Sequence, residues 1–231
     1  MQVFTASENE IQVGVLNEVE SRHCIKVLRK SLGDEINITN GKGDLLLAKI
    51  TDANQKHCGF DIVKSEKTRK LAPPLHIAIA PTKNIDRFEF FLEKCTEIGI
   101  SEITPLLCFH SERKNIKHER LEKIIVSACK QSKNFHFPNL RNLTSFKELM
   151  NTQYSQKLIA HCNKEEKTEL KNLRFSEPTL LLIGPEGDFS KEEIELALNS
   201  GFKPISLGES RLRTETAGIV ACTTVNLNYE K

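Results

Sequence analysis

The hydrophobic pattern of the first seventy residues changes its period over short distances. Ile11, Val13 and Val15 alternate with polar residues, which predicts a strand with one buried face. Residues 21–34 instead carry apolar side chains at helical spacing and reach Gly33, which predicts a short helix with a glycine stop. This part of the chain is therefore predicted to be β-rich with one short helix.

A hairpin signal follows this helix. Residues 35–50 contain two apolar runs separated by Asn40-Gly41 and Gly43, which are residue types that suit tight turns between strands. Short strands, one short helix and tight turns within this length predict a small β-barrel.

A change in composition marks a boundary near residue 72. Residues 64–74 are charged, lack hydrophobic periodicity and end in a Pro pair, which is typical of a connection between structural units. We therefore predict two domains, a β-barrel over residues 1–72 and a second domain over residues 73–231.

The second domain alternates apolar runs with segments of helical period. Strands are predicted at residues 75–81, 103–109, 157–162, 179–184 and 204–208. Helices are predicted at residues 86–100 and 118–132, after Ser190, and from about Thr214. Strands that alternate with helices predict an α/β fold with a parallel sheet and helices on both faces.

Overall charge and hydropathy exclude some classes of protein. The chain has 33 Lys and Arg against 31 Asp and Glu, so any nucleic-acid interface must come from local basic clusters. No apolar run approaches the roughly 20 residues that span a bilayer. The first residues lack the basic start and continuous apolar stretch of a signal peptide.

The seven cysteines form no C-x-x-C pair and mostly lie in apolar segments. This pattern indicates reduced thiols that pack as small hydrophobic residues, and hence a cytoplasmic protein. Neighbouring residues on a strand point to opposite faces, so adjacent His and Cys make poor chelates and no metal site is expected. The pairs in question are His23-Cys24, His57-Cys58 and His161-Cys162.

The strongest local motif lies in residues 179–193. An apolar strand ends at Ile183, a Gly-Pro-Glu-Gly loop follows, and Ser190 with Glu193 predicts a capping box for the next helix. Ligands of parallel sheets bind at the carboxyl ends of strands, where this loop lies. The loop is acidic and matches no phosphate-binding glycine motif, so it suits a cationic cofactor such as S-adenosylmethionine (SAM). An ordinary turn between a strand and a helix is the alternative.

A second motif follows the last predicted strand. That strand ends at Leu207-Gly208, and a loop with Arg211 and Arg213 leads directly into the last helix. The planar guanidinium suits phosphate or carbonyl oxygens, although a salt bridge to a nearby carboxylate, that of Glu186 or Glu215, is the alternative. Apolar residues of the last helix form either a core face or an interface; they include Ala217, Ile219, Val220, Cys222 and Val225.

Together, the sequences IGPEGDFS and LGESRLRTETA resemble the cofactor-binding signature of the SPOUT methyltransferases, in particular the RsmE-type 16S ribosomal RNA (rRNA) uridine-N3 methyltransferases. The segment HCIKVLRKSLGDEI and the following NGKG are similar to the N-terminal PUA-like barrel of that family. The segment KNIDRFEFFLEKCTEIGISEITPLLCFHSERK is similar to the start of its catalytic domain. The chain departs from the family at residues 130–134, where Lys-Gln-Ser-Lys-Asn stands in place of Glu-Gln-Ser-Gly-Arg.

This resemblance implies a PUA-like RNA-binding β-barrel followed by a SPOUT α/β domain with a C-terminal trefoil knot, SAM as cofactor and a homodimer. The implied cofactor-binding residues are Leu107, Ile183, Gly184, Pro185, Gly187, Leu207, Gly208 and Leu212. The implied RNA-binding residues are Arg22, His23, Lys26, Arg29 and Arg113. Isolated basic runs of this kind are otherwise ordinary solvated surface.

The predicted reaction is methyl transfer to N3 of one uridine in the 16S rRNA of the small ribosomal subunit. Arg211 and Arg213 are predicted to stabilise the charge that develops on the uridine, and Glu215 is the candidate base if one is used. The alternative is a ribosome-assembly RNA-binding protein whose knot binds no cofactor. An oxidoreductase or a Rossmann-type methyltransferase is disfavoured, because the chain has no phosphate-binding glycine loop.

Overall fold

The computed structural model describes residues 1–69, 74–163 and 166–229. The chain divides into two compact units: Met1–Lys70 with Cys129–Phe137 form the first, and Leu71–Ala128 with Pro138–Lys231 form the second. The predicted boundary between residues 72 and 73 lies outside the described residues.

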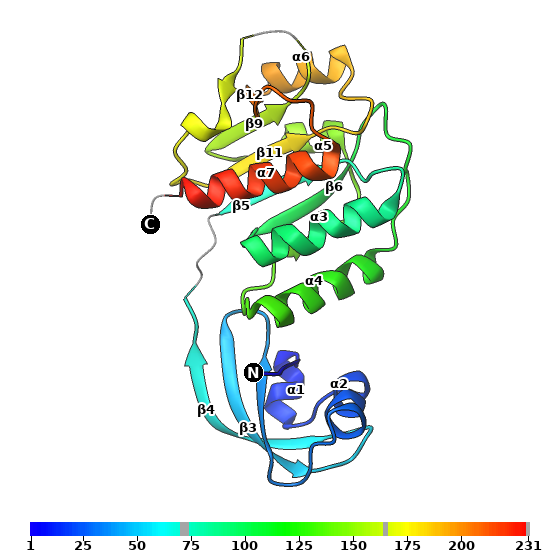
Figure 1. The fold of residues 1–231 in the computed structure, drawn as a ribbon, viewed down its shortest axis with the longest axis vertical. Coiled ribbons are helices and arrows are strands. Elements are labelled where there is room, and N and C mark those ends of the chain that lie inside the picture. Colours follow the sequence, from blue (N-terminus) through cyan, green and yellow to red (C-terminus); the bar gives the residue numbers. More distant parts are fainter. Residues whose placement is uncertain (70–73, 164–165, 230–231) are drawn as a thin grey trace. The chain divides into compact units, whose positions relative to one another are not determined.

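The first unit is built on a four-stranded sheet (Figure 1). Its strands lie in the order β1 (Val3–Thr5), β2 (Glu35–Thr39), β3 (Asp44–Asp52) and β4 (Gly59–Lys67). β1 pairs with β2 in parallel, whereas the β2–β3 and β3–β4 pairings are antiparallel. The predicted hairpin is thus confirmed as β2 and β3. Among the described residues β1 and β4 are the two edges of this sheet, where the sequence predicted a small β-barrel.

The predicted strand at residues 11–15 is largely replaced by a helix, α1 (Glu8–Val13). Ser7 and Glu10 cap this helix reciprocally: the Ser7 N–H donates to the Glu10 carboxylate at 2.6 Å, and the Glu10 N–H donates to the Ser7 hydroxyl at 3.3 Å. Gly14 ends the helix in the left-handed conformation, with φ of 74°. The caps at both ends of α1 favour a helix more strongly than the alternation of three apolar residues favours a strand.

The predicted helix at residues 21–34 is shorter and begins earlier. Helix α2 (Glu18–Arg22) starts after Asn17, whose side chain accepts a backbone N–H of the first turn at 3.0 Å. It continues as one turn of π-helix, η1 (His23–Val27). The helical conformation ends before Arg29, which has φ of 55°. The chain thus leaves the helix several residues before the predicted glycine stop.

The segment of residues 129–137 belongs to the first unit, although the residues on either side of it belong to the second. The Lys130 ammonium lies 2.8 Å from the Glu20 carboxylate and 5.9 Å from the centre of the Phe4 ring. Glu20 also accepts the Thr5 hydroxyl at 2.8 Å. Lys130, at the position where the chain departs from the family pattern, is therefore part of a largely buried ion pair of the first unit.

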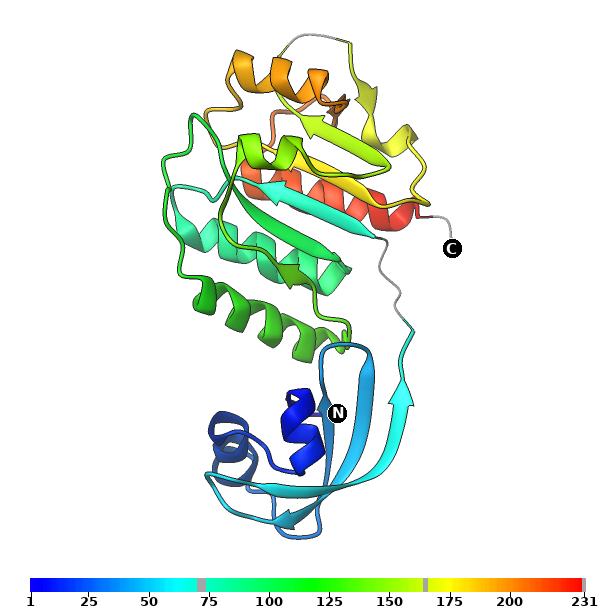
Figure 2. The same ribbon diagram turned by 180° about the vertical axis from the view of Figure 1, so that it is seen from behind.

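The second unit contains a sheet of eight strands (Figure 2), and all of their pairings are parallel, as predicted. Its path is β10-β12-β9-β11-β5-β6-β7, and β8 also pairs with β6. The strands are β5 (Leu75–Ile79), β6 (Glu102–Leu107), β7 (Asn139–Leu140), β8 (Thr144–Ser145), β9 (Gln156–Ala160), β10 (Thr168–Glu169), β11 (Thr179–Ile183) and β12 (Lys203–Ser206). The predicted strands are confirmed as β5, β6, β9, β11 and β12. The other three strands have two residues each, too few to show a period.

Helices cover both faces of this sheet, which confirms the predicted architecture. α3 and α7 lie on one face, and α5 and α6 lie on the other (Figures 1 and 2). The helical segments in chain order are α3 (Ile85–Ile98), α4 (His118–Ser132), α5 (Phe146–Met150), η2 (Leu170–Asn172), α6 (Lys191–Asn199) and α7 (Thr214–Leu227). None of the helices in the described part of the chain is long and apolar enough to cross a membrane.

Close packing of α7 against α3 fixes the start of α7 beside the sheet. A Cβ atom at Gly218 of α7 would lie 2.5 Å from two ring carbons of Phe91 of α3. Phe91 is fully buried, as are the central strands β5 and β11. The glycine therefore lets the two helices approach closely, and larger residues at this position would push α7 away.

Candidate active site

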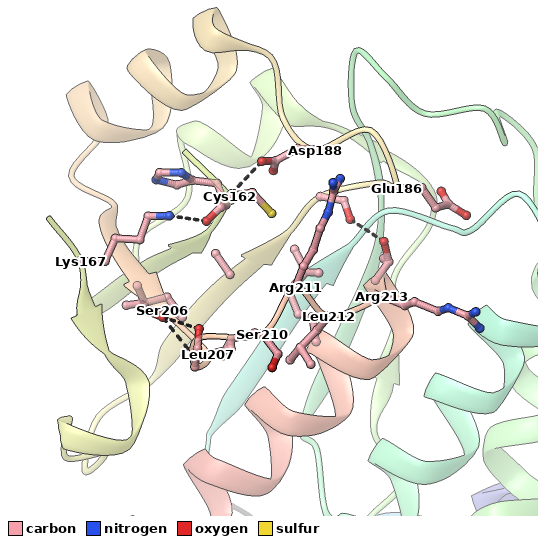
Figure 3. A pocket seen from close by; sticks show the side chains of 18 of the residues that line it. Cys162, Lys167, Glu186, Asp188, Ser206, Leu207, Ser210, Arg211, Leu212 and Arg213 are labelled. Carbon is pink, nitrogen blue, oxygen red and sulfur yellow. Dashed lines mark hydrogen bonds between the residues drawn. The ribbon is translucent and has the colours of Figure 1, made fainter. Parts of the chain in front are cut away.

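Three neighbouring strands end at one edge of the sheet and surround a pocket. β12, β9 and β11 are adjacent and parallel, so the segments that follow them meet at their carboxyl ends. These segments line a cavity of about 610 Å³ (Figure 3), a size typical of cofactor sites. The lining comprises residues 160–162, 167, 183–186, 188, 205–214 and 217.

The loop after β11 is held by its own hydrogen bonds and by the loop after β9. The Asp188 N–H donates to the Pro185 carbonyl at 2.9 Å, and Asp188 has φ of 66°, a conformation that Asp tolerates better than most residues. Its carboxylate accepts the N–H groups of Cys162 at 2.7 Å and of Phe189 at 2.8 Å. A Cβ atom at Gly184 would lie 3.1 Å from the Phe189 ring, so this position suits glycine.

The predicted capping box at the start of α6 is confirmed. The Ser190 N–H donates to the Glu193 carboxylate at 2.9 Å, and the Glu193 N–H donates to the Ser190 hydroxyl at 3.2 Å. The other Glu193 oxygen accepts the N–H of Phe109 at 2.8 Å, so the loop after β6 is tied to the same helix end.

The loop after β12 and the start of α7 form the opposite wall. The Gly208 N–H donates to the Ser206 hydroxyl at 3.2 Å, and Gly208 has φ of 126°, which only glycine adopts readily. A Cβ atom there would meet no atom within 4 Å, so the space beside this glycine is open. The buried Thr214 hydroxyl donates to the Gly184 carbonyl at 3.1 Å and joins the two walls.

The two predicted catalytic arginines line the pocket and differ in direction. Arg211 lies across the pocket toward the loop that carries Asp188, whereas the Arg213 side chain extends outward (Figure 3). Among the described residues, neither forms the salt bridge to Glu186 or Glu215 that the sequence left open. Glu186 accepts the N–H of Lys83 at 3.0 Å, and Glu215 lies 3.9 Å from the Nε atom of Arg87.

Most of the predicted cofactor-binding residues line this pocket, namely Ile183, Gly184, Pro185, Leu207, Gly208 and Leu212. Leu107 and Gly187 do not. Leu107 lies in β6 and pairs with Ser145, and a Cβ atom at Gly187 would lie 3.1 Å from Cβ of His110. The candidate base Glu215 is buried and is also absent from the lining.

Sequence reasoning missed the part of the pocket that follows β9. His161, Cys162 and Lys167 line it, and the Lys167 ammonium donates to the His161 carbonyl at 2.5 Å. Partial loss of solvent around the sulfur and the charge of Asp188 raise the pKa of the Cys162 thiol, although Arg211 opposes the shift. The strand itself was predicted, but its place between β12 and β11 was not, because hydrophobic period does not set the order of strands in a sheet.

The predicted RNA-binding residues lie in two places. Most of them lie on α2, η1 and the residues that follow, in the first unit; they are Arg22, His23, Lys26 and Arg29. Arg113 belongs to the second unit, where its guanidinium donates to the carbonyls of Thr82 at 2.9 Å and Lys83 at 2.6 Å.

The chemistry of the pocket fits SAM. Ile183, Leu207 and Leu212 supply apolar surface for a flat base, and the carboxylate of Asp188 suits a cation. The open space beside Gly208 lets a ligand approach the backbone. No group of three or more His, Cys, Asp or Glu placed to hold a metal ion is found in the described part of the chain.

Family models match both parts of the chain. An RNA methyltransferase domain matches residues 69–226, and an RNA methyltransferase PUA domain matches residues 16–63. The second match bears out the predicted PUA-like character of the first unit.

Individual proteins agree with these matches. The chain is 34% identical to "Ribosomal RNA small subunit methyltransferase E" of Buchnera aphidicola, over 91% of this chain and 86% of that protein. A probable rRNA-methyltransferase from Porphyromonas gingivalis superposes with a TM-score of 0.90 and 41% identity, over 96% of this chain and 95% of that one. Ribosomal RNA small subunit methyltransferase E from Neisseria gonorrhoeae, solved bound to S-adenosyl methionine, gives a TM-score of 0.81 and 28% identity, over 96% and 95% of the two chains. This chain belongs to the ribosomal RNA small subunit methyltransferase E family.

Proposed function

We propose that this chain transfers the methyl group of SAM to N3 of one uridine in the 16S rRNA of the small ribosomal subunit. The observation that carries the proposal is the pocket at the ends of β12, β9 and β11, which combines an apolar wall, the Asp188 carboxylate and an arginine-bearing rim. Membership of the family supports the class of enzyme, its rRNA substrate and its cofactor.

The pocket residues divide the work of holding SAM. We assign the adenine base to the apolar surface of Ile183, Leu207 and Leu212, and the positively charged sulfonium to the side of Asp188. The open space beside Gly208 lets the ligand approach the backbone there. When bound, SAM supplies a methyl group that its sulfonium charge activates for transfer.

The main chemical difficulty of the reaction is the proton on uridine N3, and the two arginines are proposed to help with its loss. Uridine N3 carries a proton that leaves only at alkaline pH, and the resulting negative charge spreads onto O2 and O4 of the base. Arg211, inside the pocket, and Arg213, on its outer side, are proposed to stabilise that charge as it develops. The burial of Glu215 beside Arg87 favours a role in anchoring the start of α7 over proton transfer.

We further propose that the segment from β12 to α7 forms the trefoil knot of the SPOUT fold. The bond from Thr214 to the Gly184 carbonyl supports it, because it holds the start of the last helix against the loop after β11. A homodimer is proposed as well, because the resemblance to the SPOUT methyltransferases implies one. Ala217, Cys222 and Val225 are already buried within the chain, so the half-buried Ile219 and Val220 and the exposed Leu227 are the apolar residues of α7 left for a partner subunit.

The first unit is the proposed RNA-docking part, with the domain boundary placed between residues 72 and 73. The exposed cations of α2 and η1 suit phosphate contacts, which depend on salt more than on sequence. We place the enzyme in the cytoplasm, where small ribosomal subunits are found. All seven cysteines are free thiols, which agrees with this location.

The test is a methylation assay with mapping of the product. Purified protein is incubated with radiolabelled SAM and 30S subunits that lack the modification, and the labelled nucleotide is then identified by nuclease digestion and mass spectrometry. A single 3-methyluridine in 16S rRNA is the expected result. SAM binding without methylation of any RNA would instead contradict the proposed activity, and failure to bind SAM would favour an RNA-binding protein without catalysis.

A further inference from the structure

Phe109 is the most exposed aromatic side chain among the described residues, with 76% of its surface accessible. It follows β6 at the edge of the sheet where the pocket lies, and its ring meets the His110 ring edge-on at 5.0 Å. A ring in this position exposes its apolar faces to water at a cost unless another flat group covers them. The described part of the chain leaves these faces largely uncovered.

The backbone beneath Phe109 is firmly held to the pocket wall. Its N–H donates to the Glu193 carboxylate at 2.8 Å, and the His110 Nδ1–H donates to the Asp188 carbonyl at 3.0 Å. Asp188 itself lines the pocket. Gly187 has no side chain, and a Cβ atom there would lie 3.1 Å from His110. The exposed ring is therefore fixed in relation to the cavity and does not swing with a free loop.

The chain segment that carries this ring and follows it is mainly cationic, although Glu193 lies against the Phe109 backbone. Residues 109–117 contain Arg113, Lys114 and Lys117 against one acidic residue, Glu112. That acid is already paired with the Lys83 ammonium at 2.8 Å. Positive charge beside a fixed aromatic ring is the combination with which proteins bind single-stranded nucleic acid, because phosphates pair with the cations while bases stack on the ring.

We propose that Phe109 is a stacking platform for an unpaired base of the RNA substrate next to the target uridine. The inference rests on the proposed function and names a positioning residue for it. Methylation at N3 requires a uridine whose pairing edge is free, so the target and its neighbours must leave the base stack. The Phe109 ring, whose backbone is held by Glu193 and whose neighbour His110 bonds the Asp188 carbonyl, replaces part of that lost stacking and sets the distance between the RNA strand and the pocket.

The chain has no tryptophan, so Phe109→Trp installs a single fluorophore at the proposed contact. The probe is a single-stranded RNA oligonucleotide of about ten nucleotides with one central uridine, within the range of strand lengths that such sites cover. We expect its addition to quench the indole emission of the Phe109→Trp variant, because stacked bases quench indole fluorescence. Phe90→Trp, at a ring of α3 that is 49% exposed, is the matched control and should show no quenching.

Truncation of the Phe109 side chain measures how much the ring contributes to RNA affinity. Phe109→Ala should weaken affinity for the same oligonucleotide by about fivefold to a hundredfold, Phe109→Tyr should retain most of it, and Phe109→Leu should behave like Ala despite its apolar side chain. SAM affinity measured by calorimetry should be unchanged in all three variants. Unchanged RNA affinity in Phe109→Ala, or no quenching of Phe109→Trp, would overturn the proposal.

Two further outcomes are distinguishable. If Phe109→Ala loses RNA affinity only together with its oligomeric state in light scattering, the ring is a protein contact and the proposal is wrong. If RNA quenches Phe109→Trp while the wild-type protein methylates no 30S RNA, the stacking site stands and the proposed enzymatic function fails.

Discussion

The hydrogen bond between Thr214 and Gly184 provides a direct test of how the pocket is held together. Thr214→Val keeps the shape and β-branching of the side chain but removes the hydroxyl that donates to the Gly184 carbonyl at 3.1 Å. Thr214 and Gly184 are both buried, so water replaces this donor poorly. A buried acceptor left without its donor costs about 1–3 kcal/mol. Because the bond joins the two walls of the pocket, we expect the loss to appear in SAM binding as well as in stability.

Calorimetry with SAM and thermal unfolding measure the two effects side by side. A loss of about 1.4 kcal/mol, within this range, corresponds to a tenfold weaker SAM affinity if it is expressed entirely in binding. Thr216→Val is the matched control, since Thr216 is exposed on the same helix and the same atoms change. The reasoning fails if Thr214→Val matches Thr216→Val in both SAM affinity and melting temperature.

Other variants test separate parts of the site and of the fold. Arg211→Ala and Arg213→Ala should each lower the single-turnover methylation rate about a hundredfold to a thousandfold with little change in SAM affinity. Lys at either position should restore only part of the rate. A parallel loss of SAM affinity and stability would mean that the arginine only holds the loop in place. Gly208→Val should abolish SAM binding in calorimetry while unfolding stays cooperative, because φ of 126° disfavours any side chain; wild-type affinity would contradict the pocket assignment. Lys130→Met should destabilise the protein by about 3 kcal/mol in chemical denaturation, because Glu20 loses its ion-pair partner. The double variant Lys130→Met with Glu20→Leu should recover much of this loss. Equal stability of the wild-type protein, the single variant and the double variant would show that the pair is unimportant.

The α/β part of the fold could be predicted because its period and its order of elements agree over long segments. Strands β5 and β11 are buried on both faces and therefore appear as continuous apolar runs. Helix α4 has the bounds that its apolar spacing predicted, residues 118–132. The strand expected at residues 11–15 was wrong for a local reason. Three alternating positions define a period weakly, whereas the Ser7 capping box and the Gly14 stop each contribute directly to helix stability.

The candidate site was predictable where a motif carried it and was missed where only topology did. The glycine loops after β11 and β12 have distinctive sequences, and six positions predicted from them line the pocket: Ile183, Gly184, Pro185, Leu207, Gly208 and Leu212. Cys162 and Lys167 have no such sequence context. They reach the pocket because β9 lies between β11 and β12, and the order of strands in a sheet cannot be read from hydrophobic period.

The two-part organisation also shows why a single cut in the chain is a poor way to separate RNA docking from catalysis. Residues 129–137 pack with the first unit, where Lys130 pairs with Glu20 and the Phe137 N–H donates to the Gly41 carbonyl at 2.8 Å. A fragment of residues 73–231 would keep this segment and lose every one of these partners, so its loss of activity would have two causes. Charge reversal at Arg22 and Arg29 avoids the problem, because both side chains are exposed on the surface of the intact protein. If the first unit docks RNA, Arg22→Glu with Arg29→Glu should weaken RNA binding and reduce its dependence on salt while SAM affinity stays constant. Methylation of 30S subunits at the wild-type rate and with the wild-type salt dependence would show that these cations do not contact the RNA.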